Sequence, residues 1–158
     1  MSDVIETDYL IVGTGAAGMA FADSLLTHSD ASVTLVDRRH APGGHWIDAY
    51  PFVHLHQPSA FYGVSSVPLG SNDVERSGVN AGFHEAAGAD ELRAYYARVM
   101  DQHFLPTGRV HHHPCTDHAI GPDGRHFITS RLTGAVHEVR VRRKWVDTGY
   151  LEGRMPAT

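Results

Sequence analysis

The sequence predicts an α/β fold, with a mainly parallel sheet, helices and a three-stranded antiparallel β-meander. Three observations support this prediction. Two apolar, β-branched runs flank an Ala- and Leu-rich stretch near the N-terminus, an amphipathic stretch follows mid-chain, and three strand-like runs separated by turn residues come later. With 158 residues, the chain is long enough for one domain with its own core, so we treat residues 1–158 as one domain.

The N-terminal segment has the pattern of a strand, a helix and a second strand. Asp8–Gly13 is a short apolar run, which is typical of a strand buried on both faces. Ala16–Leu26 contains no proline and predicts a helix, and Ala31–Val36 predicts the second strand. Because parallel strands need a crossover, we expect a right-handed βαβ unit.

The next segment, Arg38–Ser66, has no sustained period and is rich in Gly, Pro, His and aromatic residues. Long loops in compact domains are usually binding segments or disordered, and the aromatic residues favour an ordered binding segment.

A helix is then predicted over Asp90–Phe104, where apolar residues recur at helical spacing. Asp90 is the expected N-cap, and Pro106 with Gly108 is the expected stop.

Turn residues at 121–124 and 133–134 separate the later strand-like runs and predict hairpins. The runs are Val110–Ile120, Arg125–Leu132 and Ala135–Arg142, with a further apolar run at Trp145–Tyr150.

Composition excludes several classes of function. Thirteen basic against eighteen acidic residues give a net charge of −5, which argues against a nucleic-acid partner. The single cysteine, Cys115, excludes an internal disulfide framework and a thiolate zinc site, and favours a cytoplasmic location. Acidic residues near the start argue against a secretory signal, and glycines interrupt the apolar run Tyr9–Leu26, so no membrane association is expected.

Gly13-Thr-Gly15-Ala-Ala-Gly18 fits the GxGxxG pattern in the context that dinucleotide binding requires. Gly13 permits a tight turn out of the strand, Gly15 lets a pyrophosphate approach the backbone, and Gly18 allows close helix–strand packing. The N-terminus of the following helix offers N–H groups and a positive dipole end to phosphates. These residues predict a Rossmann-like fold.

Asp37 closes the second strand, where its carboxylate can bind an adenosine ribose. Arg38 and Arg39 follow, and an arginine at this place can bind the 2′-phosphate of NADP. Because Asp37 would repel that phosphate, we favour a free ribose. Periodicity and spacing leave open whether the ligand is FAD or NAD(P).

Further residues resemble a known family. Gly13 to Gly18, Asp37-Arg-Arg, Gly43-Gly-His-Trp46, the run from Tyr50-Pro51 through Pro58-Ser59 and Tyr62, and Val146-Asp-Thr-Gly149 are similar to two-dinucleotide-binding-domain flavoproteins. Within that group the sequence resembles flavin-containing monooxygenase-like oxidoreductases. His45 stands where the family usually has threonine, and Asp147 stands where it has alanine.

The resemblance implies a set of cofactor-binding residues. Gly13, Gly15, Ala16, Ala17 and Gly18 would surround the FAD pyrophosphate, Asp37 and Arg38 the ribose, and Gly44, His45 and Trp46 the pyrophosphate and ribityl chain. His56, Gln57 and Ser59 would approach the flavin ring, Cys115 would lie in the strand that meets adenine, and Thr148 with Gly149 would complete the site.

One departure from the family concerns the second glycine fingerprint, which binds NAD(P)H and is absent after Gly18. The resemblance therefore implies the N-terminal half of a longer NAD(P)H- and FAD-dependent oxidoreductase. In such an enzyme the flavin takes hydride from NADP(H) or NAD(H) and acts on a small-molecule substrate, so no catalytic residue is expected here.

Two alternatives stay open: an NAD(P)-binding Rossmann module without flavin, and a non-catalytic truncated remnant. The histidines do not predict a metal site, because consecutive residues such as His111, His112 and His113 alternate faces on a strand. Without a nucleophile elbow or a partner base, Cys115 does not predict a catalytic thiol. The basic run Arg140–Lys144 reads as a solvated strand face.

Overall fold

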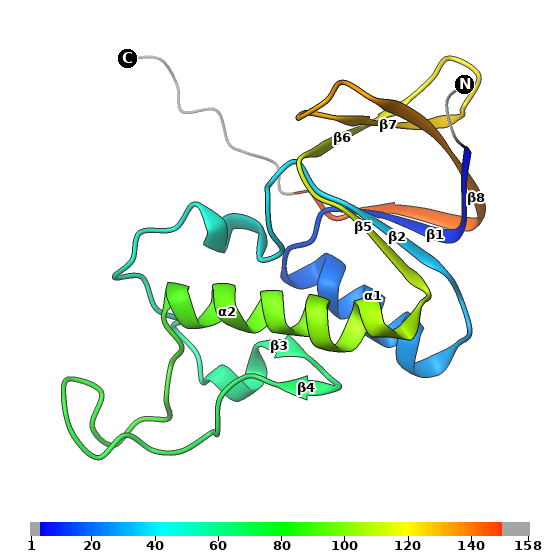
Figure 1. Cartoon of the computed structure of the whole chain (residues 1–158). Helices are drawn as coiled ribbons and strands as arrows, with labels where there is room; N and C mark the ends of the chain where they lie inside the picture. The colour runs from blue at the N-terminus through cyan, green and yellow to red at the C-terminus, as the bar shows by residue number, and fades with distance from the viewer. Residues whose placement is uncertain (1–3, 150–158) are drawn as a thin grey trace, which may run out of the picture.

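The computed structural model describes residues 4–149 (Figure 1). The strands of the main sheet are β1 (Val4–Val12), β2 (Val33–Val36), β5 (Val110–His113), β6 (Thr116–Ile120), β7 (His126–Ser130) and β8 (Val136–Asp147). A small ribbon pairs β3 (Gly63–Val64) with β4 (Val67–Pro68), and the α-helices are α1 (Ala16–His28) and α2 (Ala89–Val99). Short helical turns cover Gly44–Ile47, Ser59–Phe61, Met100–Phe104 and Leu105–Thr107.

The main sheet has the strand order β5-β2-β1-β8-β7-β6. Strands β5, β2, β1 and β8 are parallel, whereas β8, β7 and β6 are antiparallel. Figure 1 shows α1 and α2 covering one face of the parallel strands, while the β6–β7 hairpin curves over the other face. The α/β fold with a mainly parallel sheet, predicted from the sequence, is confirmed.

Two hydrophobic cores follow from this arrangement. The larger lies between the parallel strands and the helices, and the smaller lies between the parallel strands and the hairpin. Ile11 and Leu35 face the first core, whereas Leu10 and Val36 face the second, together with Ile128 of β7. The βαβ strands are therefore buried on both faces, as their continuous apolar runs predict.

The predicted strand Val110–Ile120 is wrong as one element, because it is divided into β5 and β6. Pro114 has no N–H for a strand ladder, and Cys115 takes a left-handed backbone with φ of 51°. The Cys115 N–H donates to the Arg39 carbonyl, which fixes the reversal. Consequently β5 joins the parallel strands, and only β6 belongs to the meander.

The predicted separation of Ala135–Arg142 from Trp145–Tyr150 is also wrong within the described residues. Strand β8 is continuous from Val136 to Asp147, pairing first with β7 and then with β1. No glycine or proline interrupts this segment. The third strand of the meander therefore continues into the parallel part of the sheet, where it pairs with β1. Tyr150 lies outside the described residues.

Helix α2 begins at Ala89 with Gly88 at the N-cap, so the predicted N-cap Asp90 is wrong. Asp90 lies in the first helical turn, and its carboxylate pairs with Arg93 at 3.0 Å. The α-helix ends at Val99, and a π-turn and a 3₁₀ turn carry the chain to Gly108, whose φ is 68°. The predicted apolar face is confirmed, because its five residues are buried: Leu92, Tyr95, Tyr96, Val99 and Met100.

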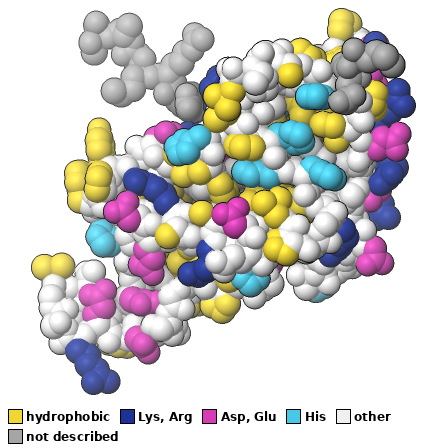
Figure 2. Space-filling view, viewed as in Figure 1, with side chains coloured by type: hydrophobic (Ala, Val, Ile, Leu, Met, Phe, Trp, Pro, Cys, Tyr) yellow, Lys and Arg dark blue, Asp and Glu magenta, His cyan; other side chains and the backbone are white. Residues whose placement is uncertain are grey.

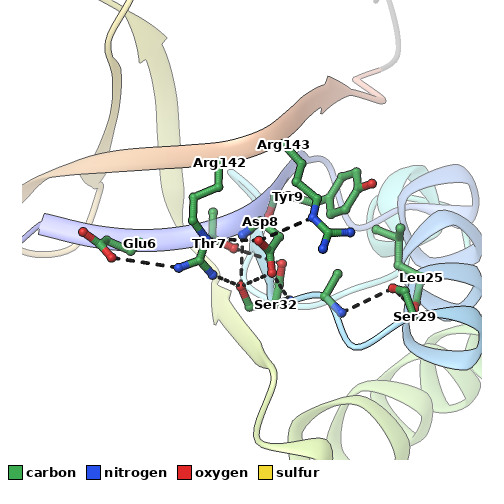
Figure 3. Close-up of polar contacts among 10 residues, drawn as sticks. Glu6, Thr7, Asp8, Tyr9, Leu25, Ser29, Ser32, Arg142 and Arg143 are labelled. Carbon is green, nitrogen blue, oxygen red and sulfur yellow. Dashed lines mark hydrogen bonds and ion pairs between the residues drawn. The ribbon is translucent and has the colours of Figure 1, made fainter.

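Polar contacts tie the N-terminal part of the sheet together (Figure 3). The Asp8 carboxylate accepts hydrogen bonds from the Ser32 N–H at 2.9 Å and from Arg142 Nε at 3.0 Å. Arg142 Nη2 also donates to Ser32 Oγ at 3.2 Å. These contacts connect β1, the segment before β2, and β8. They lie at a β-bulge, where the β1–β8 register shifts between Thr7 and Tyr9.

Histidine side chains gather on the face of the molecule over the β6–β7 hairpin and β5, with apolar side chains between them (Figure 2). Over residues 4–149, the structure has no helix long and apolar enough to cross a membrane.

Candidate functional site

The glycine turn after β1 is built by close backbone contacts. Gly13 has φ of 102°, a conformation that favours glycine, and its N–H donates to the Val36 carbonyl at 2.8 Å. A Cβ on Gly13 would lie 2.6 Å from Thr148 Oγ1. Thr148 Oγ1 donates to the Val12 carbonyl at 2.9 Å, so the residue after β8 closes over this turn.

The other two glycines of the fingerprint allow two close contacts between backbone segments. A Cβ on Gly18 would overlap the Gly13 carbonyl oxygen, so its absence lets α1 pack directly on the end of β1. Gly15 faces Gly44, and a Cβ on Gly44 would lie 2.8 Å from the Gly15 Cα. The Gly43 N–H donates to the Thr14 carbonyl at 2.8 Å, which holds the second glycine segment against the first.

Asp37 is joined to the same turn from the end of β2. One carboxylate oxygen accepts the Thr14 N–H at 2.7 Å and the Thr14 hydroxyl at 2.8 Å. The other accepts the Arg39 N–H at 2.8 Å. Asp37 is only 5% exposed, and a carboxylate has about four lone-pair sites, so one remains for a ligand hydroxyl.

These elements surround a cavity of about 720 Å³ at the carboxyl ends of the parallel strands. Ligands of open α/β sheets bind at this edge. Helix α1 starts there with Gly15 at its N-cap, no side-chain cap and no acidic residue in its first turn. Ten predicted cofactor-binding residues line the cavity: Gly13, Gly15, Ala16, Ala17, Asp37, Arg38, Gly44, His45, Thr148 and Gly149.

The remaining predicted residues are outside the cavity lining. Gly18 is buried beneath the turn, and Trp46 is buried with its indole N–H donating to the Tyr62 hydroxyl at 2.8 Å. Cys115 occupies the turn between β5 and β6, so its predicted position in a strand is wrong. Gln57 is exposed, and its contact with a flavin ring stays a prediction.

Two other residues of that loop also lie outside the lining. His56 is exposed, whereas Ser59 is buried with its hydroxyl accepting the Ala87 N–H at 2.8 Å. Any approach of these two residues to a flavin likewise stays a prediction.

Sequence reasoning missed one wall of the cavity, formed by Thr116, Asp117 and His118 of β6. The Thr116 N–H donates to the Asp37 carbonyl at 2.8 Å, which places this strand beside the acid that is predicted to bind the ribose. Pro114 was the available signal, since a proline inside a strand-like run indicates an interruption. Val12, Val36, Arg39 and Asp147 complete the lining.

The His118 ring of this wall packs with two further aromatic rings, those of His126 and Trp145. His118 Nε2 and His126 Nδ1 share a hydrogen bond of 3.0 Å, and their rings are stacked. Trp145 lies against both, with ring centroids 5.6 Å from His118 and 5.3 Å from His126. Burial lowers the pKa of both imidazoles, which favours their neutral forms at pH 7.

Between residues 4 and 149, no three His, Cys, Asp or Glu side chains are grouped so that they could hold a metal ion. The cavity has the uncapped backbone amides at the start of α1 on one side and the His118 imidazole of β6 on its wall.

Residues 11–67 match the NAD(P)-binding Rossmann-like domain family. Over 153 residues, the chain is 50% identical to the uncharacterized protein Rv2000 of Mycobacterium tuberculosis. That alignment covers 97% of this chain and 28% of the relative, so the chain spans little more than a quarter of the relative's length.

Solved structures share the fold. A flavin-containing monooxygenase from Stenotrophomonas maltophilia aligns with 91% of this chain and 38% of its own, at 19% identity and a TM-score of 0.61. A bacillithiol disulfide reductase from Bacillus cereus aligns with 90% of this chain and 39% of its own, at 15% identity and a TM-score of 0.68. Over residues 11–67 the chain is therefore similar to NAD(P)-binding Rossmann-like domains, and its fold is the one found in a flavin-containing monooxygenase and a disulfide reductase.

Proposed function

We propose that the chain binds FAD and forms the FAD-binding portion of an NAD(P)H- and FAD-dependent oxidoreductase similar to flavin monooxygenases. The observation that carries the proposal is the cavity in which the glycine turn, the uncapped N-terminus of α1 and Asp37 meet. Each of these features suits one part of an ADP group, and the shared fold with a flavin-containing monooxygenase supports flavin as the attached group.

The residues present fit this cofactor. Gly15 and Gly44 line the cavity without side chains, and Cβ atoms there would fill space between the two loops. Arg38 is exposed on the cavity wall and makes no hydrogen bond or ion pair within the described chain, so its guanidinium is available to the ligand.

In the proposed complex, the N–H groups at the start of α1 hold the diphosphate, and Asp37 accepts a ribose hydroxyl. Thr148 and Gly149 close the turn from the β8 side. A bound flavin would accept hydride from a nicotinamide and pass the electrons onward to oxygen or a substrate. This chain's own residues bind and orient the cofactor, and we assign none of them an acid–base role.

The proposal extends to the architecture of the protein. We infer that residues 1–158 act with further polypeptide that supplies the NAD(P)H and substrate sites, as the length of the mycobacterial relative suggests. We also propose a cytoplasmic location, which the single cysteine favours.

A charge placed at the phosphate end of the cavity tests FAD binding. Ala17 is exposed in the first turn of α1 and lines the cavity. Ala17→Glu suits a helix N-terminus electrostatically and should keep the fold, but it would repel a diphosphate. We expect it to weaken FAD binding at least about tenfold, with a smaller effect for Ala17→Gln.

Titration of flavin fluorescence and calorimetry measure the affinities, and thermal unfolding verifies the fold of both variants. Equal FAD affinity in the wild type and Ala17→Glu would contradict a diphosphate at this helix end.

A second candidate function is NAD(P) binding without flavin, and the family match over residues 11–67 specifically favours it. Parallel titrations with FAD, NADPH and NADH distinguish the two, because our proposal requires FAD to bind more tightly than either nicotinamide cofactor. Saturating FAD should also raise the unfolding midpoint, because it binds only the folded state. If no dinucleotide raised it, the chain would be a non-binding remnant.

A further inference from the structure

We propose that histidines between the β6–β7 hairpin and the parallel strands form a proton-sensitive switch, which weakens the packing of the hairpin in mildly acidic solution. This histidine layer has four half-buried members, each from a different strand: His113 of β5, His118 of β6, His126 of β7 and His137 of β8. Because β6 also forms one wall of the cavity, the layer holds that wall in place. The switch goes beyond the proposed function, since it does not depend on which ligand the cavity binds.

The strand register shows that the histidine layer surrounds the smaller core. That core has four buried apolar residues, and residues paired across neighbouring strands lie on the same face of a sheet. Each of the four is opposite a histidine or Trp145: Val36 pairs with His113, Ile128 with His118 and His137, Val139 with His126, and Leu10 with Trp145. Histidines with apolar side chains between them are visible on this face of the molecule (Figure 2). A protonated imidazole here would be charged in apolar surroundings, which is unfavourable.

The hydrogen bond between His118 and His126 limits the number of protons further. Its two atoms, His118 Nε2 and His126 Nδ1, lie 3.0 Å apart, and the ring centroids are 5.3 Å apart. Whichever nitrogen donates, the other must accept through a lone pair. Protonation of both rings would put a hydrogen on both nitrogens, break this bond and place two positive charges in stacked rings. The pair therefore keeps its contact only while at least one ring is neutral.

The groups that act on the layer mostly oppose added protons. Burial is the main cause that lowers the pKa of His113, and two neighbouring histidines lower it further, His111 and His137. Burial and then His126 lower the pKa of His118, whereas Asp147 of β8 raises it. Burial also lowers the pKa of His126. His126 and Trp145 share a shallow cavity of about 350 Å³ with several charged side chains, four basic and one acidic: Arg125, Arg140, Arg143, Lys144 and Glu138.

Other acidic side chains of these strands already have basic partners. Asp117 and Glu138 are each adjacent in sequence to a histidine of the layer, so they lie on the opposite face of their strands. The ion pairs join Asp117 to Arg131, Glu138 to Arg125, and Asp8 of β1 to Arg142. Strand β2 contributes Val36 and Thr34 to the face of the layer, and neither carries a charge.

The direction of the pH effect follows from these contacts. In the folded protein the pKa values of His113, His118 and His126 lie below the ordinary value of 6.5, so the unfolded chain binds more protons in mild acid. Stability is therefore complete above about pH 6.5 and is lost as the pH falls below it. Each of the three histidines can lower the ratio of folded to unfolded protein up to about tenfold between pH 7.5 and 5.5.

Urea denaturation at pH 7.5, 6.5 and 5.5 tests the switch with a double variant that has no imidazole at either position. In His118→Gln/His126→Asn, the Gln amide replaces Nε2 and the Asn amide replaces Nδ1, so a hydrogen bond between them can be kept. Between pH 7.5 and 5.5, the folded-to-unfolded ratio of the wild type should fall at least about tenfold more than that of the double variant.

His103→Gln is the matched control, because His103 is exposed and lies outside the layer. Its ratio should fall as much as that of the wild type. His112 faces the helix layer, opposite Leu35, and is present in all three proteins, so its contribution cancels.

NMR of the wild type gives a measurement that needs no variant. The imidazole C–H resonances of His118 and His126 should keep the chemical shifts of neutral rings in the folded protein at pH 6. Two charged rings in the folded protein at that pH would overturn the switch. An equal loss of stability in the wild type and in the double variant would overturn it as well.

Discussion

At the scale of single residues, the Asp37 carboxylate has a structural task beside its proposed contact with a ribose. It accepts three hydrogen bonds, two of them from the buried Thr14, and thereby sets the shape of the glycine turn. A buried donor that loses its acceptor costs about 1–3 kcal/mol. The residue expected to bind the ligand is therefore also needed for the fold around it.

Asp37→Ala should lower the free energy of unfolding by about 2–4 kcal/mol, because both Thr14 donors lose their acceptor. Urea denaturation measures the change. Asp48→Ala is the matched control, since Asp48 is an exposed carboxylate paired with Arg39, and its loss should cost less than about 1 kcal/mol. Similar losses in the two variants would show that the Thr14 contacts contribute little.

Asp8 supplies a pH-dependent contribution at the other end of the sheet. The Ser32 backbone N–H and, after it, Arg142 lower the pKa of Asp8 from 3.8 to about 2. Since the folded-state pKa is the lower one, the stabilisation is present above about pH 4 and is lost as the pH falls toward 2. The wild type should therefore exceed Asp8→Asn in stability at pH 7, and the difference should shrink between pH 4 and 2.

Urea denaturation of both proteins across this pH range measures that difference. Ala20→Ser, which adds no carboxyl or other acidic group at an exposed position of α1, should show a constant offset from the wild type. A constant offset for Asp8→Asn as well would contradict the role of the Asp8 contacts shown in Figure 3.

At the scale of elements, the contact between β1 and α1 depends on the absence of a side chain at Gly18. Helix α1 can start at the cavity only because Gly18 lies directly on the Gly13 carbonyl. This backbone contact places the N-terminus of α1 next to the end of β2, where Asp37 sits.

Gly18→Ala should push α1 away from β1 and lower the free energy of unfolding by about 1–3 kcal/mol, despite the better helix propensity of alanine. Denaturant titration measures the loss. Ala20→Ser, at an exposed position of the same helix, should change stability by about 0.5 kcal/mol. A stabilised Gly18→Ala protein would mean that the helix and strand can separate without cost.

At the scale of the whole molecule, one sheet separates two cores, and β1 contributes alternate residues to both. Such sharing should make the helix layer and the β6–β7 hairpin unfold together. The two tryptophans report on the two sides, since Trp46 packs in the helix core and Trp145 lies beside the hairpin.

Leu92→Ala in α2 and Ile128→Ala in β7 each truncate a fully buried side chain, so each should lower stability by about 2–5 kcal/mol. In each variant, the fluorescence of Trp46 and that of Trp145 should give the same unfolding midpoint. The two signals are separated by measuring each variant in a Trp145→Phe background, where only Trp46 reports, and in a Trp46→Phe background, where only Trp145 reports. Separate midpoints after Ile128→Ala would show that the hairpin unfolds independently.

Features that depend on neighbours in the chain were predictable. The βαβ unit, the amphipathic face of α2 and the Gly108 stop follow from periodicity and turn chemistry, which act over a few residues. The same holds for the glycine turn and for Asp37, because the fingerprint fixes their relative positions. Errors arose at boundaries, as with Asp90, where a neighbouring glycine took the N-cap position.

The amino-acid sequence alone thus determined the α/β class and the glycine-turn end of the cavity, because local conformational preferences are encoded in adjacent residues. Only the tertiary structure decided that β5 pairs with β2, that β8 serves two kinds of pairing, and that His118 and His126 meet beside the cavity. Strand pairing joins residues far apart in the chain, and several apolar strands could form backbone hydrogen bonds with the same strand edge. The choice among them depends on packing of the complete fold, which no single segment records.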